Sequence, residues 1–151
     1  MSPFVPDHVE RHGTVRVGAP LREAFLHFTP EGERAWVSGW SPEFLHPRDR
    51  TESAGAVFRT DAGGEDTLWL IAAFDPEAGL AEYVRVTPGS RMGTVSIRAE
   101  SVSPSDTVVH VTYRMTALSP AGNEVLRAFD AGFDAMMVEW ADGVARTRRA
   151  K

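Results

Sequence analysis

The sequence contains no cysteine in its 151 residues, and Lys151 is its only lysine. Without cysteine there is no disulfide bond, no thiolate nucleophile and no zinc site with thiolate ligands. The formal net charge of −5 does not supply the broad basic surface that binding to a phosphate backbone requires, so we expect no nucleic acid partner. No run of about 18 apolar residues occurs, and we therefore expect no membrane span.

Motifs that hold cofactors or metal ions are also missing. The chain has no Gly-rich nucleotide-binding motif and no HExxH, and His8 and His12 fall in or before a strand rather than on a helix. Gly63-Gly64 separates two apolar runs as a hairpin turn does. We therefore expect no cofactor and no metal ion. Residues 1–17 lack the apolar core of a signal peptide, which favours a cytoplasmic location.

The length and the ordinary globular composition predict one domain, residues 1–151. Residues 9–17 have the pattern of a strand, and a short helix with one apolar face follows over residues 21–28. Residues 29–47, TPEGERAWVSGWSPEFLHP, begin as a second short helix. Thr29-Pro30 is a start signal, and Glu31 and Glu33 suit the positive end of the helix dipole.

Residues 55–116 change to a period of two, which is typical of half-buried strands. Five runs rich in β-branched and aromatic residues are separated by short turn clusters: 56–60, 67–74, 80–86, 91–102 and 107–118. Connections this short leave no room for crossover helices, so the strands should pair antiparallel and in sequence order. The strand at 107–118 directs Tyr113 inward, in phase with Val109 and Val111.

A long amphipathic helix is predicted from Ser119-Pro120 to about Arg148. Its apolar positions recur at steps of three and four: Val125, Phe129, Phe133, Met136, Met137, Trp140 and Val144. The cations of the tail suit the negative end of this helix better than a nucleic acid contact. They are Arg146, Arg148, Arg149 and Lys151.

This order of elements resembles the helix-grip fold of the START-like superfamily, which includes polyketide cyclases and birch-pollen-allergen-like proteins. The segments AFLHFTPEGERAWVSGWSPEF, TLWLIAAFDP, AEYVRVTPGSRMG and HVTYRMTALSPAGNEVL are similar to a mostly uncharacterised bacterial branch of it. The resemblance implies an α+β fold: a curved antiparallel sheet of about six strands around a long C-terminal helix, with two short helices after the first strand. It also implies a cavity between the sheet and the helix.

Three functions are compatible with this resemblance. The first is binding of a small hydrophobic or amphipathic molecule in the cavity. The alternatives are a polyketide cyclase or aromatase-like enzyme, in which a Tyr, Arg or His moves protons, and a protein-interaction module like the chaperone activators of the superfamily. The residues expected to line the cavity are Trp36, Trp40, Phe44, Trp69, Ile71, Tyr83, Arg85, Val95, Ile97, Val111, Tyr113, Phe129, Phe133, Met136 and Met137.

Two features of these candidates stay open at the sequence level. In one interpretation, Trp36 packs on the final helix, and Trp40 and Phe44 lie in a lid-like loop at the cavity entrance. In the alternative, all three rings fill that end of the core. If Tyr83 and Arg85 point inward, the arginine needs a partner such as a ligand carboxylate or phenolate, because an unpaired buried charge is costly. Val84 and Val86 look like the natural core pair, which favours Arg85 in solvent.

The strand over residues 67–74 is apolar on both faces. Trp69 and Ile71 fall on one side, and Leu68, Leu70 and Phe74 on the other. An antiparallel sheet with one solvated face normally alternates apolar and polar residues. The pattern indicates that something covers the outer side, and we expect a contact between two copies of the chain there.

Overall fold

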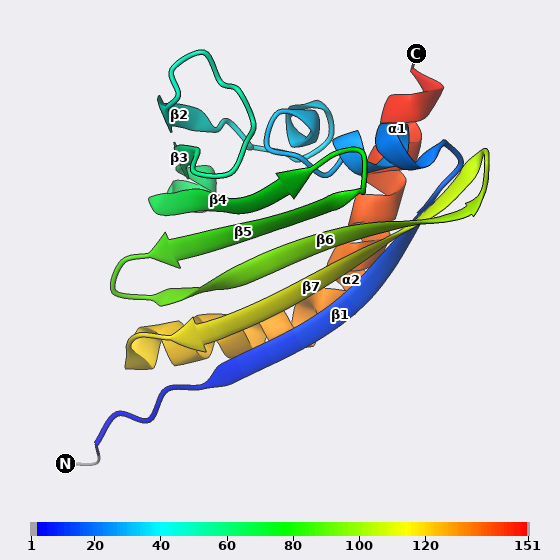
Figure 1. The fold of residues 1–151 in the computed structure, drawn as a ribbon. Coiled ribbons are helices and arrows are strands. Elements are labelled where there is room, and N and C mark those ends of the chain that lie inside the picture. Colours follow the sequence, from blue (N-terminus) through cyan, green and yellow to red (C-terminus); the bar gives the residue numbers. More distant parts are fainter. Residues whose placement is uncertain (1–2, 151) are drawn as a thin grey trace.

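The computed structural model describes residues 3–150, which form a curved antiparallel sheet and a long helix (Figure 1). The strands are β1 (His8–Val17), β2 (Glu43–His46), β3 (Val57–Thr60), β4 (Thr67–Asp75), β5 (Leu80–Thr87), β6 (Arg91–Ser103) and β7 (Asp106–Ala117). The helices are α1 (Leu21–Leu26) and α2 (Pro120–Arg149), with 3-10 helices η1 (Gly32–Ala35) and η2 (Ala62–Gly64). The seven strands follow the order β1-β7-β6-β5-β4-β3-β2. The predicted α+β helix-grip class and its meander are confirmed.

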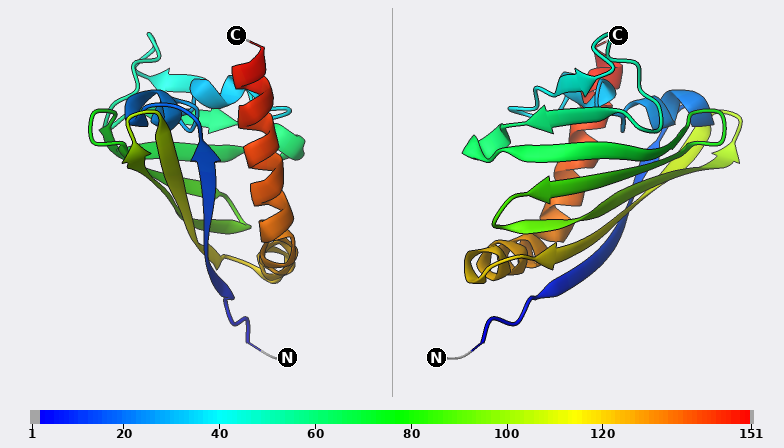
Figure 2. Two further views of the ribbon diagram at one scale, coloured as in Figure 1. Left: turned by 90° about the vertical axis from the view of Figure 1, so that its right-hand side faces the viewer. Right: turned by 60° about the vertical axis from the view of Figure 1, so that its left-hand side comes forward.

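Helix α2 lies on one face of the sheet, which we call the inner face (Figure 2). It packs mainly on β1 and β7 at one edge. The helix begins where expected: Ser119 is the N-cap and its hydroxyl accepts the N–H of Gly122 at 3.0 Å. Arginines 146, 148 and 149 occupy its last turn, where they suit the negative end of the dipole. Lys151 lies outside the described residues. No helix within residues 3–150 is long and apolar enough to cross a membrane.

The α1–η1 segment closes one end of the layer between sheet and helix. The Trp36 ring meets Trp140 of α2 edge-on at 5.4 Å, and its indole N–H donates to the carbonyl of His27. Gly143 makes room for this ring, since a Cβ there would lie 2.9 Å from Trp36 Cε3. The expected packing of Trp36 on the final helix is confirmed.

Strand β2 was not expected, and it adds a seventh strand to the sheet. Phe44 was expected in a lid-like loop, but it lies on β2, paired in register with Phe58 of β3. Only 8% of its surface is exposed. Four residues between Pro42 and Pro47 are too few to show a strand period, and pairing with β3 supplies the order.

Phe74 also lies on the other face from the one expected. A bulge between Ile71 and Ala73 shifts the alternation of β4, so Phe74 turns inward and contacts Phe25 at 5.6 Å. Leu68 and Leu70 precede the bulge and stay on the outer face, about two-fifths exposed.

Candidate functional site

A row of side chains crosses the inner face, with one residue from each of four adjacent strands. The register places Phe44, Phe58, Trp69 and Arg85 side by side on β2 to β5. Phe44 stacks on Phe58 at 5.2 Å and Phe58 stacks on Trp69 at 5.5 Å, with the latter pair 5° from parallel. The guanidinium carbon of Arg85 lies 4.8 Å from the Trp69 ring centre. We call this set the aromatic row.

Trp40 covers the aromatic row from the side of the α1–η1 segment. Its ring meets both Phe58 and Trp69 edge-on, at 6.2 and 5.7 Å. Its indole N–H donates to the carbonyl of Pro30 at 2.8 Å, which fixes its orientation. Trp40 is half-buried, so it covers the row without being sealed in the core.

Arg85 therefore points inward, and the favoured expectation of a solvated Arg85 is wrong. The register of β5 explains the difference. Val84 and Val86 pair with Leu70 and Leu68 of β4 and extend an apolar patch on the outer face. The two valines thus belong to a surface patch rather than to the core, and the alternate positions turn inward.

The environment of Arg85 leaves part of its hydrogen-bonding capacity unused. Its Nε is buried and has no hydrogen-bond partner within residues 3–150, while Nη2 donates to the Thr87 hydroxyl at 3.3 Å. Burial lowers the pKa of Arg85 below its ordinary value, and Tyr113 partly opposes this shift. Contact with the face of Trp69 offsets some of the lost hydration. A buried cation without a carboxylate partner is costly for a fold to keep.

Tyr113 faces inward as expected and lies close enough to Arg85 for the two to influence each other's ionisation. Its ring packs against Phe129, Phe133 and Trp140 of α2, at 5.0, 6.0 and 6.3 Å. Its hydroxyl makes no hydrogen bond to any residue in the described range, and burial raises its pKa above the ordinary value. It remains a neutral donor beside a cation.

Glu33 of η1 adds an acidic group to the same region. Glu33 is half-buried, and within the part of the chain that the structure describes its carboxyl makes neither an ion pair nor a side-chain hydrogen bond. Burial, together with repulsion from Glu52, raises the pKa of Glu33 to about 8. Tyr83 and Tyr113 both experience its charge, so it lies on the inner-face side of η1. At neutral pH this carboxyl is mostly protonated.

Sequence reasoning assigned Glu33 to the helix dipole and so missed it as a site residue. Nothing in the local pattern marks it, because an acidic residue in the first turn of a helix is ordinary. Tyr83 was a candidate, and its hydroxyl is already occupied: it donates to the carbonyl of Phe28 at 3.2 Å.

The other candidates belong to the hydrophobic core or pack against it. Those on the strands are buried: Ile71, Val95, Ile97 and Val111. On α2, Phe133 and Met137 are buried, while Phe129 and Met136 are half-buried. Contacting rings occupy much of the layer between sheet and helix, in the sequence Phe28, Trp36, Trp140, Tyr113, Phe129 and Phe133. Solvent still reaches Arg85, Trp40, Phe129 and Met136 in part.

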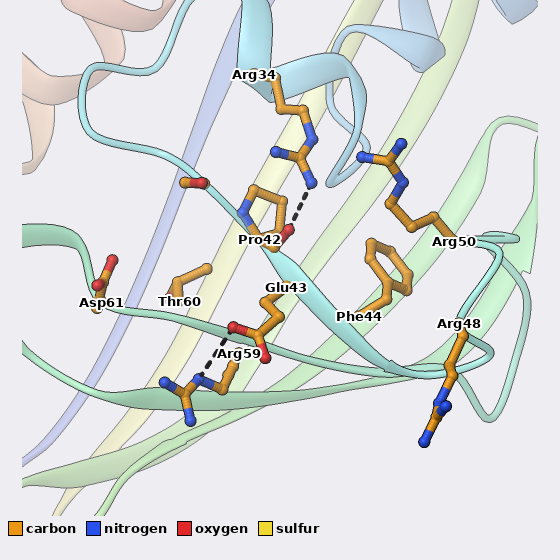
Figure 3. Close-up of a pocket in the computed structure, with 10 residues that line it drawn as sticks. Arg34, Pro42, Glu43, Phe44, Arg48, Arg50, Arg59, Thr60 and Asp61 are labelled. Carbon is orange, nitrogen blue, oxygen red and sulfur yellow. Dashed lines mark hydrogen bonds and ion pairs between the residues drawn. The ribbon is translucent and has the colours of Figure 1, made fainter.

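Pockets open at the margins of this layer. One of about 500 Å³ lies at the β2–β3 edge beside Phe44 (Figure 3). Another, of about 360 Å³, lies between Trp36, Trp140 and the end of α2. No cluster of three or more metal-ligating side chains occurs within residues 3–150.

Comparison with solved structures gives matches over nearly the whole chain. The ZhuI aromatase/cyclase from Streptomyces sp. R1128 is 21% identical, with a TM-score of 0.62 over 97% of this chain and 98% of its own. Norcoclaurine synthase from Thalictrum flavum, in complex with dopamine and hydroxybenzaldehyde, is 11% identical, with a TM-score of 0.64 over 93% and 86%. Ara h 8.0201 is 15% identical, with a TM-score of 0.59 over 94% and 99%.

These similarities establish the fold that the sequence resemblance to the START-like superfamily implied. No protein-family profile matches the chain, and no curated protein matches it in sequence. The neighbours therefore show a shared architecture on which ligand binding and cyclase chemistry both occur.

Proposed function

We propose that the chain binds a small amphipathic molecule with an acidic or phenolic oxygen on the inner face, between the sheet and α2. The observation that carries the proposal is Arg85, an inward-facing cation whose Nε is buried without a partner. An oxyanion of a ligand is the group that such a cation lacks. The Tyr113 hydroxyl is a second unused donor beside it.

The surroundings of Arg85 fit an aromatic or aliphatic ligand body. Trp69 contacts Arg85, Phe129 contacts Tyr113, and Trp40 packs on Trp69, so aromatic surface lies next to the two donors. The solved norcoclaurine synthase complex holds dopamine and hydroxybenzaldehyde on the same fold, which is consistent with small aromatic ligands. Some of the rings that fill the layer, Phe129 in particular, would shift to admit a ligand.

The test pairs an acid with a neutral molecule of the same shape. 1-Naphthoic acid and 1-naphthalenemethanol are titrated into wild type, Arg85→Met and Arg98→Met by calorimetry. Arg98 is an exposed residue of β6, so its variant controls for net charge. We expect Arg85→Met to lower the affinity for 1-naphthoic acid by about tenfold and the affinity for 1-naphthalenemethanol by less than about twofold. Equal losses in the two variants, or no binding to wild type, would overturn the proposal.

A second candidate function is a cyclase-like enzyme, and the specific observation in its favour is Glu33. A carboxyl with a pKa of about 8 can give or take a proton near neutral pH. The charges of Glu33 and Arg85 both act on Tyr113, so the three would supply an acid, a neutral donor and a cation for enolisation of a carbonyl compound. Once a substrate is identified, Glu33→Gln should lower kcat more than it raises KM. Full turnover in Glu33→Gln and Tyr113→Phe would remove both residues from the mechanism.

We also propose that two copies of the chain meet through the outer face of the sheet. Leu68, Leu70 and Met92 are each about two-fifths exposed there, next to Val84 and Val86. Exposed apolar patches on a sheet often mark such contacts. Light scattering at micromolar concentration should give the mass of a dimer for wild type and of a monomer for Leu70→Lys. A monomeric wild type would end this part of the account.

A further inference from the structure

The pocket at the β2–β3 edge is built differently from the inner face. Its lining is polar and contains four arginines, with Phe44 the main apolar surface (Figure 3). The complete lining is Arg34, Ser41, Pro42, Glu43, Phe44, Arg48, Arg50, Arg59, Thr60 and Asp61. The lining has four arginines and the two carboxylates of Glu43 and Asp61, and Glu31 pairs with Arg34 from outside it; the pocket still carries a net positive charge on a chain whose formal net charge is −5.

The four arginines are not equivalent, because only two are tied to carboxylates. Arg59 lies 3.8 Å from Glu43. Arg34 bonds both oxygens of Glu31, and its Nη2 also donates to the carbonyl of Pro42 at 2.5 Å. Arg48 and Arg50 make no ion pair or hydrogen bond through their side chains within the described part of the chain.

Arg34, which is held by hydrogen bonds, and Arg50, whose side chain has no partner within residues 3–150, face the same space. Figure 3 shows the guanidinium groups of Arg34 and Arg50 turned toward each other near the Phe44 ring, while Arg48 extends away from them. Within residues 3–150, hydrogen bonds hold Nε and Nη2 of Arg34 but not Nη1, which leaves Nη1 as a donor for a ligand in the pocket. Two planar guanidinium groups can share the oxygens of one anion.

The backbone of Arg50 gives an independent reason to assign it a role. Its φ of 65° lies in the left-handed region, where it is the only residue other than glycine within residues 3–150. That conformation costs on the order of 1 kcal/mol for a residue with a Cβ, and glycine avoids the cost. A glycine at this position would satisfy the turn, whereas arginine adds a cation at the pocket.

We propose that this pocket binds a small organic anion, whose phosphate or carboxylate oxygens lie between Arg34 and Arg50 and whose apolar body contacts Phe44. The site is separate from the inner-face site and does not rest on it. Phe44 belongs to both, since it ends the aromatic row and also lines the pocket. The inner-face site depends on Arg85, which does not line this pocket.

The experiment uses phenyl phosphate, benzoate, inorganic phosphate and phenol as probes, titrated by calorimetry into the whole chain. The key variant is Arg50→Gly, because it removes the cation and also suits the left-handed backbone. Its urea midpoint should equal or exceed that of wild type, while its affinity for phenyl phosphate should fall about tenfold. Arg98→Gly would change the backbone of a strand, so Arg98→Gln serves as the charge control and should alter the affinity by less than about twofold.

The four probes separate the contributions of charge and of the apolar body. We expect phenyl phosphate to bind more tightly than inorganic phosphate, benzoate to bind detectably, and phenol not to bind at this pocket. The proposal is overturned if phenyl phosphate does not saturate, or if phenol binds as tightly as phenyl phosphate to Arg85→Met, in which the inner-face site is disabled. It is equally overturned if Arg98→Gln loses as much affinity for phenyl phosphate as Arg50→Gly. It is also overturned if binding of phenyl phosphate is lost in Arg85→Met and retained in Arg50→Gly, since this result would place the anion on the inner face.

Discussion

At the scale of single residues, the inner face contains ionisable groups that have no ion-pair partner within residues 3–150. Arg85 rests on Trp69 with its Nε unbonded, and Glu33 is half-buried without an ion-pair partner within residues 3–150. Structural ion pairs normally satisfy both partners, because removing charge from water is costly. Groups that remain unsatisfied in this way are typical of binding and catalytic sites.

Replacing Arg85 should therefore not destabilise the protein as loss of a buried ion pair would. Arg85→Met keeps most of the apolar stem over Trp69 and removes a buried charge that has no carboxylate partner. We expect the free energy of unfolding to be unchanged or to rise by about 1–2 kcal/mol, measured by urea denaturation. A loss of 3 kcal/mol or more, of the order seen when a buried pair is broken, would show that Arg85 is a structural residue.

Glu33 should make the stability depend on pH in the direction opposite to ordinary acid denaturation. Its pKa is about 8 in the folded chain, against an ordinary value of 4.5 that applies when unfolded. Below pH 4.5 both states are protonated, and the stability associated with this group is fully present. Between 4.5 and 8 the unfolded state ionises first, so stability falls with rising pH, by on the order of 3 kcal/mol.

The measurement is a series of urea midpoints from pH 5 to pH 8 for wild type and Glu33→Gln. The glutamine cannot ionise, so the urea midpoint of the variant should fall much less with rising pH than that of wild type. A small fall should remain, because burial also raises the pKa of Glu52. Glu124→Gln, at an exposed position on α2, is the control and should follow wild type. Identical pH profiles for wild type and Glu33→Gln would contradict the burial of this carboxyl.

Whether the sequence predicts the correct face of the sheet for a residue depends on which neighbours share its side of the strand. Tyr113 was placed correctly because it shares the alternation of valines 109 and 111, whose side is decided by the core. Arg85 was placed on the wrong side because Val84 and Val86 face a second apolar surface. A period of two identifies two faces but does not say which one is inside.

At the scale of elements, the junction between the Trp36 segment and α2 holds one end of the fold. The Trp36 ring sits against Gly143, and Phe28 and Trp140 surround it. Helix α2 has a second interior glycine, Gly132, where an added Cβ would meet no packed neighbour within 4 Å. The two positions can be compared directly. Glycine lowers helix propensity at both, but only at position 143 does the missing side chain make room for a neighbour, Trp36.

Gly143→Ala and Gly132→Ala should change stability in opposite directions. The alanine Cβ at position 143 would meet Trp36 at 2.9 Å, and overpacking of this kind costs about 1–3 kcal/mol. At position 132 the substitution should stabilise by about 0.5–1 kcal/mol, through helix propensity alone. Thermal midpoints of the two variants provide the measurement. If Gly143→Ala were as stable as Gly132→Ala, the contact with Trp36 would not be tight.

The elements that the sequence predicts most clearly are those in which the apolar pattern repeats several times. Strands β4 to β7 and helix α2 each show several repeats of their pattern, and all were predicted; the four-residue strand β3 was predicted as one of a series of apolar runs separated by turn clusters. Strand β2 has four residues and the β4 bulge is one residue, so neither leaves a period to detect. Pairing with neighbouring strands, which is a tertiary effect, decides both.

At the scale of the whole molecule, the two proposed binding sites and the proposed contact surface lie on different parts of one sheet. The aromatic row runs from the arginine pocket beside Phe44 to Arg85 in the inner layer, so the two sites lie at its opposite ends. The outer leucines of β4 face away from both. Ligand binding and self-association can therefore be tested separately.

The central claim is that a small acidic or phenolic molecule binds on the inner face beside Arg85. Amide NMR of the labelled chain, titrated with 1-naphthoic acid, tests this most directly because it reports the location of binding. We predict saturable shifts clustered at residues 69–71, 83–87, 111–115 and 129–140, and their loss in Arg85→Met. Shifts confined to the outer face of the sheet or to residues 44–60, or no saturable shifts at all, would contradict the claim.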